Sequence, residues 1–256
     1  MTRLLSGVAL AAAAVAAILF LPVIGLRLLA SLVAVLAAHE YLRIAVPGSV
    51  VRGQGPVLLI VALTCWYMLL PDVGTLIGLV VITLAVLAMD VLFAGATIQA
   101  AAARFVAPWY IGMPLGMLVS VQGANGPWAT LLLLATVVVS DSAQYYTGRA
   151  FGKRPLAPTI SPKKTIEGAV GGVVFGTLFM ALVGPRVLPG APPASLAALG
   201  LTIVVLGILG DLFESRLKRV AQLKDSSSLI PGHGGVLDRI DALLFAVPAY
   251  YLYLRP

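Results

Sequence analysis

Residues 195–215, SLAALGLTIVVLGILGDLFES, decide the class of fold. The run stays apolar for long enough to cross the hydrocarbon core of a membrane, which takes about 20 helical residues. Charge begins only at its end, with Asp211 and Glu214. A second apolar run, residues 238–254, follows after a strongly charged segment. We therefore expect two membrane-spanning helices here, with the charged segment between them at a membrane surface.

The whole chain has the composition of an integral membrane protein. Of its 256 residues, 60% are hydrophobic and 11% are charged, whereas about a quarter of the residues in soluble domains are charged. We expect an all-α integral membrane protein with about nine transmembrane helices, about five in an N-terminal region, residues 1–124, and about four in a catalytic region, residues 125–256. The expected spans are residues 4–24, 26–46, 56–71, 73–93, 105–122, 127–147, 166–187, 195–215 and 238–254.

The distribution of charge along the chain gives the expected orientation. With nine spans, 14 of the 17 lysine and arginine residues fall on the side of the N-terminus, and such an excess marks the cytoplasmic side. This rule accounts for the net charge of +7 without nucleic acid as a partner. Nine of the ten acidic residues fall on the same side, although acids do not follow the rule. We therefore expect a multi-pass protein of the cell (inner) membrane, with the N-terminus and the active site cytoplasmic, the latter at the ends of the C-terminal helices.

The segment between the last two spans, GDLFESRLKRVAQLKDSSSLIPGHGGVLDRID at residues 210–241, holds ten of the 27 charged residues. Its acids include two pairs that each place two carboxylates three residues apart, on one helix face. The pairs are Asp211 with Glu214 and Asp238 with Asp241. Two helix ends can thus bring four carboxylates together, and carboxylates with water and phosphate oxygens are the ligands of Mg²⁺. A membrane anchor on a solvated surface, the simpler interpretation, explains the lysines of this segment but not its acids.

Residues 141–172, DSAQYYTGRAFGKRPLAPTISPKKTIEGAVGG, form a second informative stretch. Asp141 lies within an expected span, where an isolated charge is costly and marks a functional site by default. A basic loop then leads to SPKKT, whose lysines precede the first turn of a helix that Ser161 or Thr165 is expected to cap. Lysines beside the positive end of a helix are unfavourable unless an anion, such as a nucleotide phosphate, lies between them. The glycines expected to form a face for close helix packing are Gly168, Gly171, Gly172 and Gly176.

Both stretches resemble the phosphatidate cytidylyltransferases, the CDP-diacylglycerol synthases. The resemblance covers about residues 135–256, and the N-terminal half is similar only in being hydrophobic and multispanning. Gln144 is a slight departure from the family pattern, which leaves local contacts around Asp141 open. The matching motifs are Asp141, SPKKT at 161–165 followed by Glu167 and Gly168, SRLKR at 215–219, KDSS at 224–227, HGG at 233–235 and DRID at 238–241.

The resemblance implies that the chain converts CTP and phosphatidic acid to CDP-diacylglycerol and pyrophosphate with Mg²⁺ as cofactor. An oxygen of the lipid phosphate would attack the α-phosphate of CTP, so that the protein has to hold two anions in line and neutralise their charge. A monovalent cation beside Mg²⁺ is left open, and a homodimer in the lipid bilayer is suggested. The implied metal-binding residues are Asp211 and Asp238, with Glu214, Asp241 and Asp141 beside them.

The resemblance also implies which residues act on the substrates. His233 is expected either to protonate the departing pyrophosphate or to fix the glycine-rich turn around it. The residues expected to be catalytic are Asp211, Asp238, Lys218, Lys224, Asp225 and His233. The residues expected to bind phosphate groups are Lys163, Lys164, Arg219, Ser226, Ser227, Gly234, Gly235 and Arg239.

Other functions stay open on the sequence. The closest is a cytidylyltransferase for another anionic lipid. His233 and Asp238 also satisfy the His-x4-Asp spacing of glycerolipid acyltransferases, and a transporter would account for the spans but not for charge gathered at one interface. A nucleotide-binding GxxxxGK[ST] loop, which would favour a kinase, is absent, and so is the Asp-Gly pair of CDP-alcohol phosphotransferases.

The first hundred residues offer few further signals. His39, Glu40 and Asp90 are interpreted as anchors at the membrane interface. Two prolines and two glycines in residues 105–122 predict a kinked or closely packed helix. These four residues are Pro108, Gly112, Pro114 and Gly116.

Overall fold

The chain folds into helices that group into two units. The structure, a computed structural model, describes residues 2–46, 54–68, 72–227, 229–230 and 234–254. Contacts within the chain define unit 1 as residues 1–123 with 220–239, and unit 2 as residues 124–219 with 240–256. The segment 220–239 thus groups with the N-terminal helices, whereas the sequence analysis assigned it to the C-terminal region.

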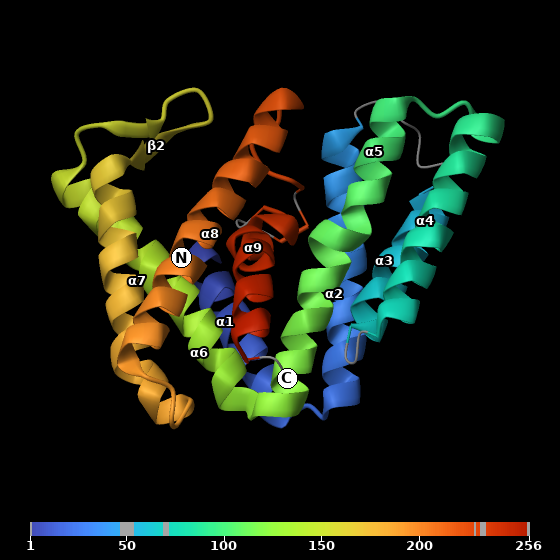
Figure 1. The fold of residues 1–256 in the computed structure, drawn as a ribbon. Coiled ribbons are helices and arrows are strands. Elements are labelled where there is room, and N and C mark those ends of the chain that lie inside the picture. Colours follow the sequence, from blue (N-terminus) through green and yellow to red (C-terminus); the bar gives the residue numbers. More distant parts are fainter. Residues whose placement is uncertain (1, 47–53, 69–71, 228, 231–233, 255–256) are drawn as a thin grey trace. The chain divides into compact units, whose positions relative to one another are not determined.

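Unit 1 is entirely helical in its described N-terminal part (Figure 1). Asp72 begins α4, since its carboxylate accepts a hydrogen bond from the Thr75 amide at 2.9 Å, and Gly95 ends that helix in the left-handed conformation with φ +65°. The helix α3 contacts α2, α4 and η1. The elements are α1 (Thr2–Phe20), α2 (Val23–Ala45), α3 (Gln54–Tyr67), α4 (Val73–Ala94), α5 (Ile98–Ala107), the π-helix η1 (Pro108–Gly112) and the start of α6 (Met113–Phe151).

The predicted close packing in residues 105–122 is confirmed. A Cβ atom at Gly112 would lie 2.6 Å from the Val61 carbonyl oxygen, and one at Gly116 would lie 2.5 Å from that of Cys65. Only glycine lets α3 approach the chain this closely. Gly112 is the last residue of the π-helix, whose first residue, Pro108, removes a backbone donor.

Unit 2 combines helices with a short β-hairpin that the sequence analysis did not predict. The strands β1 and β2 pair antiparallel, and the hairpin leads directly into α7 (Figure 1). Thr165 caps α7, as one of the two predicted candidates, by accepting a hydrogen bond from the Gly168 amide at 3.1 Å. The elements are the rest of α6, β1 (Pro155–Ala157), β2 (Ser161–Thr165), α7 (Ile166–Val187), α8 (Pro193–Val220) and most of α9 (Leu237–Leu254).

The helix α6 contains a break that separates two of the expected spans. Gly126 has φ +81° and ψ 177°, a conformation that residues with a side chain rarely adopt. Pro127 follows and cannot donate a backbone hydrogen bond. The break at Gly126 therefore lies between two of the expected spans, residues 105–122 and 127–147.

The predicted glycine face of α7 is confirmed as a packing surface. A Cβ atom at Gly168 would lie 2.7 Å from the Gln144 carbonyl oxygen of α6, and Cβ atoms at Gly171 and Gly172 would collide with the side chains of Thr147 and Gln144. At Gly176 a Cβ atom would lie 2.5 Å from Val204 of α8. The small residues thus bring α7 close to α6 and α8.

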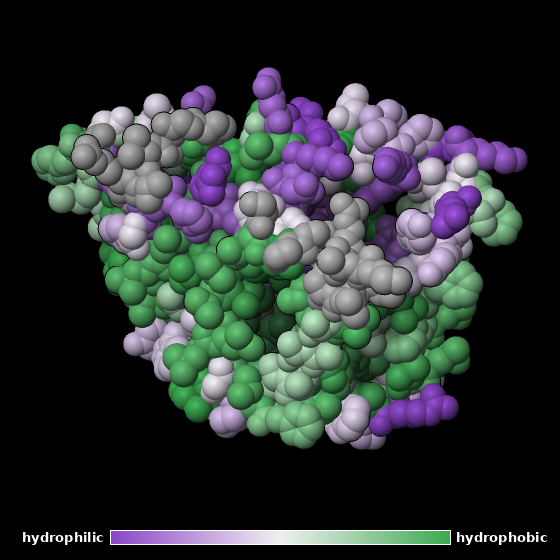
Figure 2. All heavy atoms as spheres, turned by 180° about the vertical axis from the view of Figure 1, so that it is seen from behind, coloured by the Kyte–Doolittle hydropathy of each residue, from purple (hydrophilic) through white to green (hydrophobic). Residues whose placement is uncertain are grey.

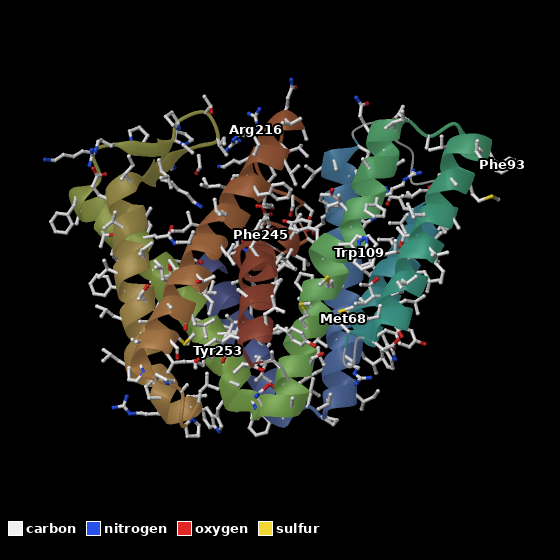
Figure 3. All side chains as sticks on the ribbon, viewed as in Figure 1. Met68, Phe93, Trp109, Arg216, Phe245 and Tyr253 are labelled. Atoms are coloured by element: carbon white, nitrogen blue, oxygen red, sulfur yellow. The ribbon has the colours of Figure 1, made fainter. Side chains whose placement is uncertain are left out.

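Five helices in the described part of the chain are long and apolar enough to cross a membrane. The all-α class is confirmed, apart from the hairpin, and the chain is a multi-pass membrane protein; the number of nine spans stays a prediction. On the face shown in Figure 2, hydrophilic residues gather mainly along one edge and hydrophobic residues cover most of the area below it. Phe93, 77% exposed, points away from its unit, whereas Met68, 1% exposed, lies inside it (Figure 3). The five helices are Val23–Ala45, Val73–Phe93, Ile98–Phe151, Ile166–Val187 and Pro193–Val220.

Candidate active site

Three carboxylates gather in unit 2, and we call Asp141, Asp211 and Asp241 the carboxylate cluster. They come from α6, α8 and α9 respectively. Lys164 on β2 forms an ion pair with Asp211. Asp141 and Asp241 both lie close enough to Asp211 to repel it electrostatically, and close enough to Lys164 to attract it. Three carboxylates therefore lie within electrostatic range of the lysine of the hairpin.

A neighbouring pair on α8 neutralises itself. Glu214, which is fully buried, forms an ion pair with Lys218 at 2.5 Å, one helical turn further on. Lys218 also attracts Asp241. Gln144 donates a hydrogen bond to Asp141 at 3.0 Å. Gln144 and Lys218 thus interact with Asp141 and Asp241, respectively, but do not neutralise all three carboxylates of the cluster.

The close approach of α8 and α9 depends on Gly210. A Cβ atom at this position would lie 2.5 Å from the Asp241 carbonyl oxygen and 3.0 Å from the Phe245 ring. Glycine therefore lets the backbone at Asp241 pass directly beside the residue that precedes Asp211. This is the local reason why the two carboxylates meet.

The hairpin that carries Lys164 is fixed at its base and at its tip. Glu167, in the first turn of α7, accepts hydrogen bonds from the backbone amides of Lys153 at 3.1 Å and Arg154 at 3.2 Å. Arg219, near the end of α8, donates from Nε to the Ile160 carbonyl oxygen at 3.1 Å. Lys164 is thereby directed toward α8.

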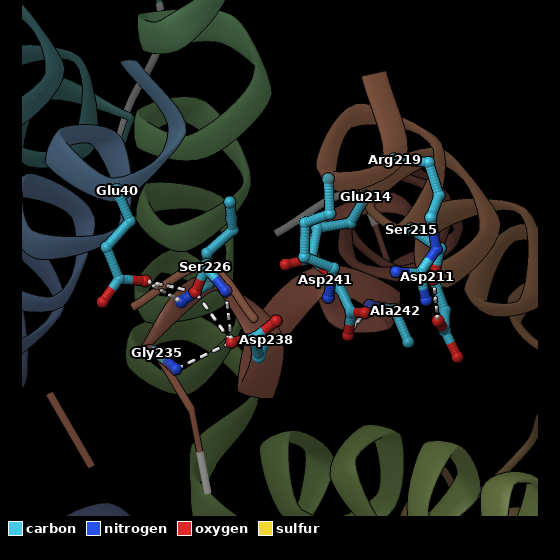
Figure 4. Close-up of polar contacts among 12 residues, drawn as sticks. Glu40, Asp211, Glu214, Ser215, Arg219, Ser226, Gly235, Asp238, Asp241 and Ala242 are labelled. Atoms are coloured by element: carbon cyan, nitrogen blue, oxygen red, sulfur yellow. Dashed lines mark hydrogen bonds and ion pairs between the residues drawn. The ribbon is translucent and has the colours of Figure 1, made fainter. Parts of the chain in front are cut away.

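A second group of carboxylates lies in unit 1. Glu40 on α2 is 4% exposed, and its carboxylate accepts hydrogen bonds from three donors in the loop before α9 and one at the first residue of α9. Figure 4 shows the contact with Ser226. We call the described residues 224–227, 229–230 and 234–236, which precede α9, the loop. The donors are the hydroxyls of Ser226 at 2.9 Å and Ser227 at 2.6 Å and the amides of Val236 at 3.1 Å and Leu237 at 2.8 Å.

Asp238, the second residue of α9, closes the same loop. Its Oδ2 atom accepts hydrogen bonds from the Ser226 amide at 2.9 Å and from the Gly235 amide at 2.7 Å, and lies 2.8 Å from the Ser226 hydroxyl (Figure 4). A Cβ atom at Gly235 would collide with both Ser226 Oγ and Glu40 Oε2. Glycine is therefore required where the carboxylate of α2 approaches the backbone.

The predicted site residues fall into two groups. Unit 2 brings together Asp141, Lys164, Asp211, Glu214, Lys218 and Asp241, with Arg219 at the hairpin tip. Unit 1 brings together Ser226, Ser227, Gly235 and Asp238, with Gly234 and Asp225 next to them. Lys163, Lys224 and Arg239 are exposed. His233 lies outside the described residues.

Two interpretations of the sequence are wrong. Glu40 and Asp90 were expected to be anchors at the membrane interface, but Glu40 binds the loop and Asp90 forms an ion pair with Arg104 at 2.7 Å in which both side chains are largely buried. One signal could have pointed to Glu40: it lies within an apolar run, where a carboxylate without a partner is costly. Such a carboxylate needs donors from elsewhere in the chain.

The chemistry of the carboxylate cluster fits a hard divalent cation. Carboxylate oxygens are the protein ligands that Mg²⁺ prefers, and three carboxylates exceed the charge of the one lysine that pairs with Asp211. Within the residues that the structure describes, no three His, Cys, Asp or Glu side chains already have the mutual spacing of a metal site. The metal ligands therefore stay a prediction that the charge of the cluster favours.

Comparison with known proteins places this geometry in context. The sequence profile described as the cytidylyltransferase family matches residues 1–256. The phosphatidate cytidylyltransferase of Aquifex aeolicus is 43% identical over 124 residues, 48% of this chain and 46% of that protein, and that of Bacillus subtilis is 40% identical over 147 residues, 57% and 55% of the two. The uncharacterized protein YnbB of Escherichia coli is 40% identical over 149 residues, 58% and 48% of the two. The chain thus matches about half the length of these relatives.

Proposed function

The chain belongs to the cytidylyltransferase family, and from this premise we propose that it transfers the cytidylyl group of CTP to phosphatidic acid. The products are CDP-diacylglycerol and pyrophosphate. The names of the Aquifex aeolicus and Bacillus subtilis relatives support phosphatidic acid as the lipid substrate. The runner-up, another anionic lipid, uses the same chemistry and differs only in what binds beyond the phosphate.

The observation that carries the proposal is the ion pair between Lys164 and Asp211. The pair joins a basic hairpin to a cluster of acids, so that an ammonium group and several carboxylates lie side by side. A complex of a nucleotide triphosphate with a divalent cation has the complementary charges. Its phosphates attract the lysine, and its cation attracts the carboxylates.

The reaction requires positioning and neutralisation of charge more than a reactive side chain. An oxygen of the lipid phosphate forms a bond to the α-phosphorus of CTP, and the bond from that phosphorus to the oxygen bridging to the β-phosphate breaks. Lys164 and Lys163, on β2, bind the triphosphate, and Lys218 and Arg219 on α8 neutralise the lipid phosphate or the departing pyrophosphate. The electron pair of the broken bond leaves with the pyrophosphate.

The carboxylates of Asp211, Asp241 and Asp141 hold Mg²⁺ in this proposal. When bound, the ion neutralises phosphate charge and orients the α-phosphate. Asp238, one helical turn before Asp241 in α9, stays a proposed ligand. A comparison of turnover in K⁺ or Na⁺ with turnover in a large organic cation tests whether a monovalent cation also binds at the site.

We further propose that the site faces the cytoplasm and that the protein resides in the inner membrane as a homodimer. The excess of lysine and arginine on the side of the N-terminus supports the orientation. The homodimer rests on the family resemblance, and crosslinking in the membrane tests it.

The experiment that tests the function uses the detergent-purified chain with cytidine-labelled CTP, Mg²⁺ and phosphatidic acid. We expect label in the lipid phase and an equal amount of pyrophosphate, both dependent on metal and lipid. Parallel reactions with phosphatidylglycerol phosphate and an isoprenyl phosphate distinguish the runner-up. Consumption of acyl-CoA without labelled lipid would contradict the proposal and favour an acyltransferase.

A further inference from the structure

Glu40 and the loop form a contact between distant parts of the sequence in unit 1. The Glu40 carboxylate meets Ser226 across a sequence separation of 186 residues. Four donors converge on its two oxygens, two from side chains and two from the backbone. Hydrogen bonds to a buried charged group are stronger than those between neutral groups. The loop is therefore fastened to α2 and not only to its own neighbours.

Glu40 is a carboxylate in a buried place. It lies five residues before the end of α2 (Val23–Ala45) and is 4% exposed. Burying a charged group is costly unless hydrogen bonds replace those to water. Here four donors, three in the loop and one at the first residue of α9, supply these hydrogen bonds.

Ser226 connects Glu40 to Asp238. The serine hydroxyl lies 2.9 Å from Glu40 Oε2 and 2.8 Å from Asp238 Oδ2. A hydroxyl carries one hydrogen and donates it to one acceptor at a time, so that the two carboxylates share this donor. A displacement of Glu40 is thereby transmitted to the acceptor at the start of α9.

We propose that Glu40 is a positioning residue of the active site, because it fixes the loop and through Ser226 the side chain of Asp238. Glu40 itself touches no substrate. Its role rests on the proposed function only in that Asp238 and the loop act in cytidylyl transfer. The geometry assigns the support of Asp238 within unit 1 to α2, which the family motifs of the sequence do not include.

The first test measures backbone exchange, which does not depend on activity. Hydrogen exchange of peptides covering residues 234–240 is compared in wild type, Glu40→Gln, Glu40→Asp and Asp90→Asn. Gln brings a donor to a place surrounded by donors, so that we expect at least about tenfold faster exchange in Glu40→Gln. Glu40→Asp keeps the charge and should recover part of the protection. Asp90→Asn, which removes a buried carboxylate elsewhere in unit 1, should leave these peptides unchanged.

The second test measures turnover in the same four proteins. We expect Glu40→Gln to lower kcat about 10- to 100-fold, the range for residues that orient an active site, with the KM for CTP changed much less. Unaltered exchange in Glu40→Gln, or equal loosening in Asp90→Asn, would overturn the proposal. If wild type itself transfers no cytidylyl group while exchange responds as expected, the proposed function fails and the fastening of the loop by Glu40 stands.

Discussion

The two groups of carboxylates in this protein satisfy their charge in opposite ways. In unit 1, Glu40 on α2 and Asp238 on α9 accept hydrogen bonds from hydroxyls and backbone amides in and next to the loop. In unit 2, Asp141 and Asp241 each repel Asp211, which forms an ion pair with Lys164 of the hairpin. The first arrangement stabilises a conformation. The arrangement in unit 2 has more carboxylates than ion-pair partners and therefore suits a cation that binds together with the substrate.

The largest expected effect comes from the same substitution in each group. Asp211→Asn should lower kcat at least about 10²- to 10³-fold, as loss of one electrostatic contact in an active site does, while hydrogen exchange in the loop stays as in wild type. Asp238→Asn should lower kcat as much and also accelerate exchange at residues 234–237, since its Oδ2 accepts from two loop amides. Turnover assays and exchange measurements on both variants check this. Near-normal kcat in Asp211→Asn would remove the cluster from the mechanism.

The next prediction concerns the crowding at Gly235. Gly235→Ala places a methyl group against Ser226 Oγ and Glu40 Oε2, and such overpacking typically costs about 1–3 kcal/mol. We expect a lower unfolding temperature and a lower kcat. Gly78→Ala is the matched control, because nothing lies within 4 Å of its Cβ position in α4, and alanine there should stabilise the helix slightly. Equal behaviour of the two variants would contradict the close approach of α2 to the loop.

A smaller effect is expected at the base of the hairpin. Glu167→Gln weakens the hydrogen bonds to the amides of Lys153 and Arg154, each worth about 0.5–1.5 kcal/mol net. Because these bonds only orient the hairpin that carries Lys164, the KM for CTP should rise a few-fold with kcat nearly unchanged. Steady-state kinetics at varied CTP check this. A loss of kcat comparable to that of Asp211→Asn would instead place Glu167 in the chemistry.

The smallest effect belongs to a carboxylate outside both groups. Hydrogen bonds from the Thr75 hydroxyl and amide lower the pKa of Asp72 below its usual value. These hydrogen bonds therefore stabilise the folded state above the pKa of Asp72 in the unfolded chain, about 3.9. This stabilisation is lost as the pH falls through the lower pKa of Asp72 in the folded protein. Asp72→Ala should reduce this acid dependence of the unfolding temperature and leave turnover unchanged. An altered kcat would show that the N-terminal end of α4 takes part in the function.

The parts of the fold that the sequence predicted are those set by local patterns. The apolar runs, the break before Pro127, the cap at Thr165 and the glycine face of α7 follow from residue types at fixed spacing along one helix. Local periodicity is sufficient for such features. The predicted set of four carboxylates is found only in part: Asp211 and Asp241 lie close together, whereas Glu214 pairs with Lys218. Asp238 accepts hydrogen bonds from the loop.

The parts that were missed depend on contacts between distant residues. Lys164 meets Asp211 across 47 residues and Ser226 meets Glu40 across 186, and nothing in the spacing of a single helix specifies such partners. Ser226, Ser227 and Gly235 were expected to donate to phosphate, whereas the structure shows them donating to carboxylates. A role toward phosphate stays a prediction that requires the loop to exchange partners.

The central claim is that the carboxylate cluster holds a divalent cation, and binding of Mn²⁺ tests it most directly. Electron paramagnetic resonance of Mn²⁺ titrated into the detergent-purified protein, with CTP present, gives the affinity for wild type, Asp211→Asn and the control Asp90→Asn. We predict binding at least about tenfold weaker in Asp211→Asn, since residues that only support metal ligands already change affinity by that much, and unchanged binding in Asp90→Asn. Equal affinity in wild type and Asp211→Asn would contradict the account.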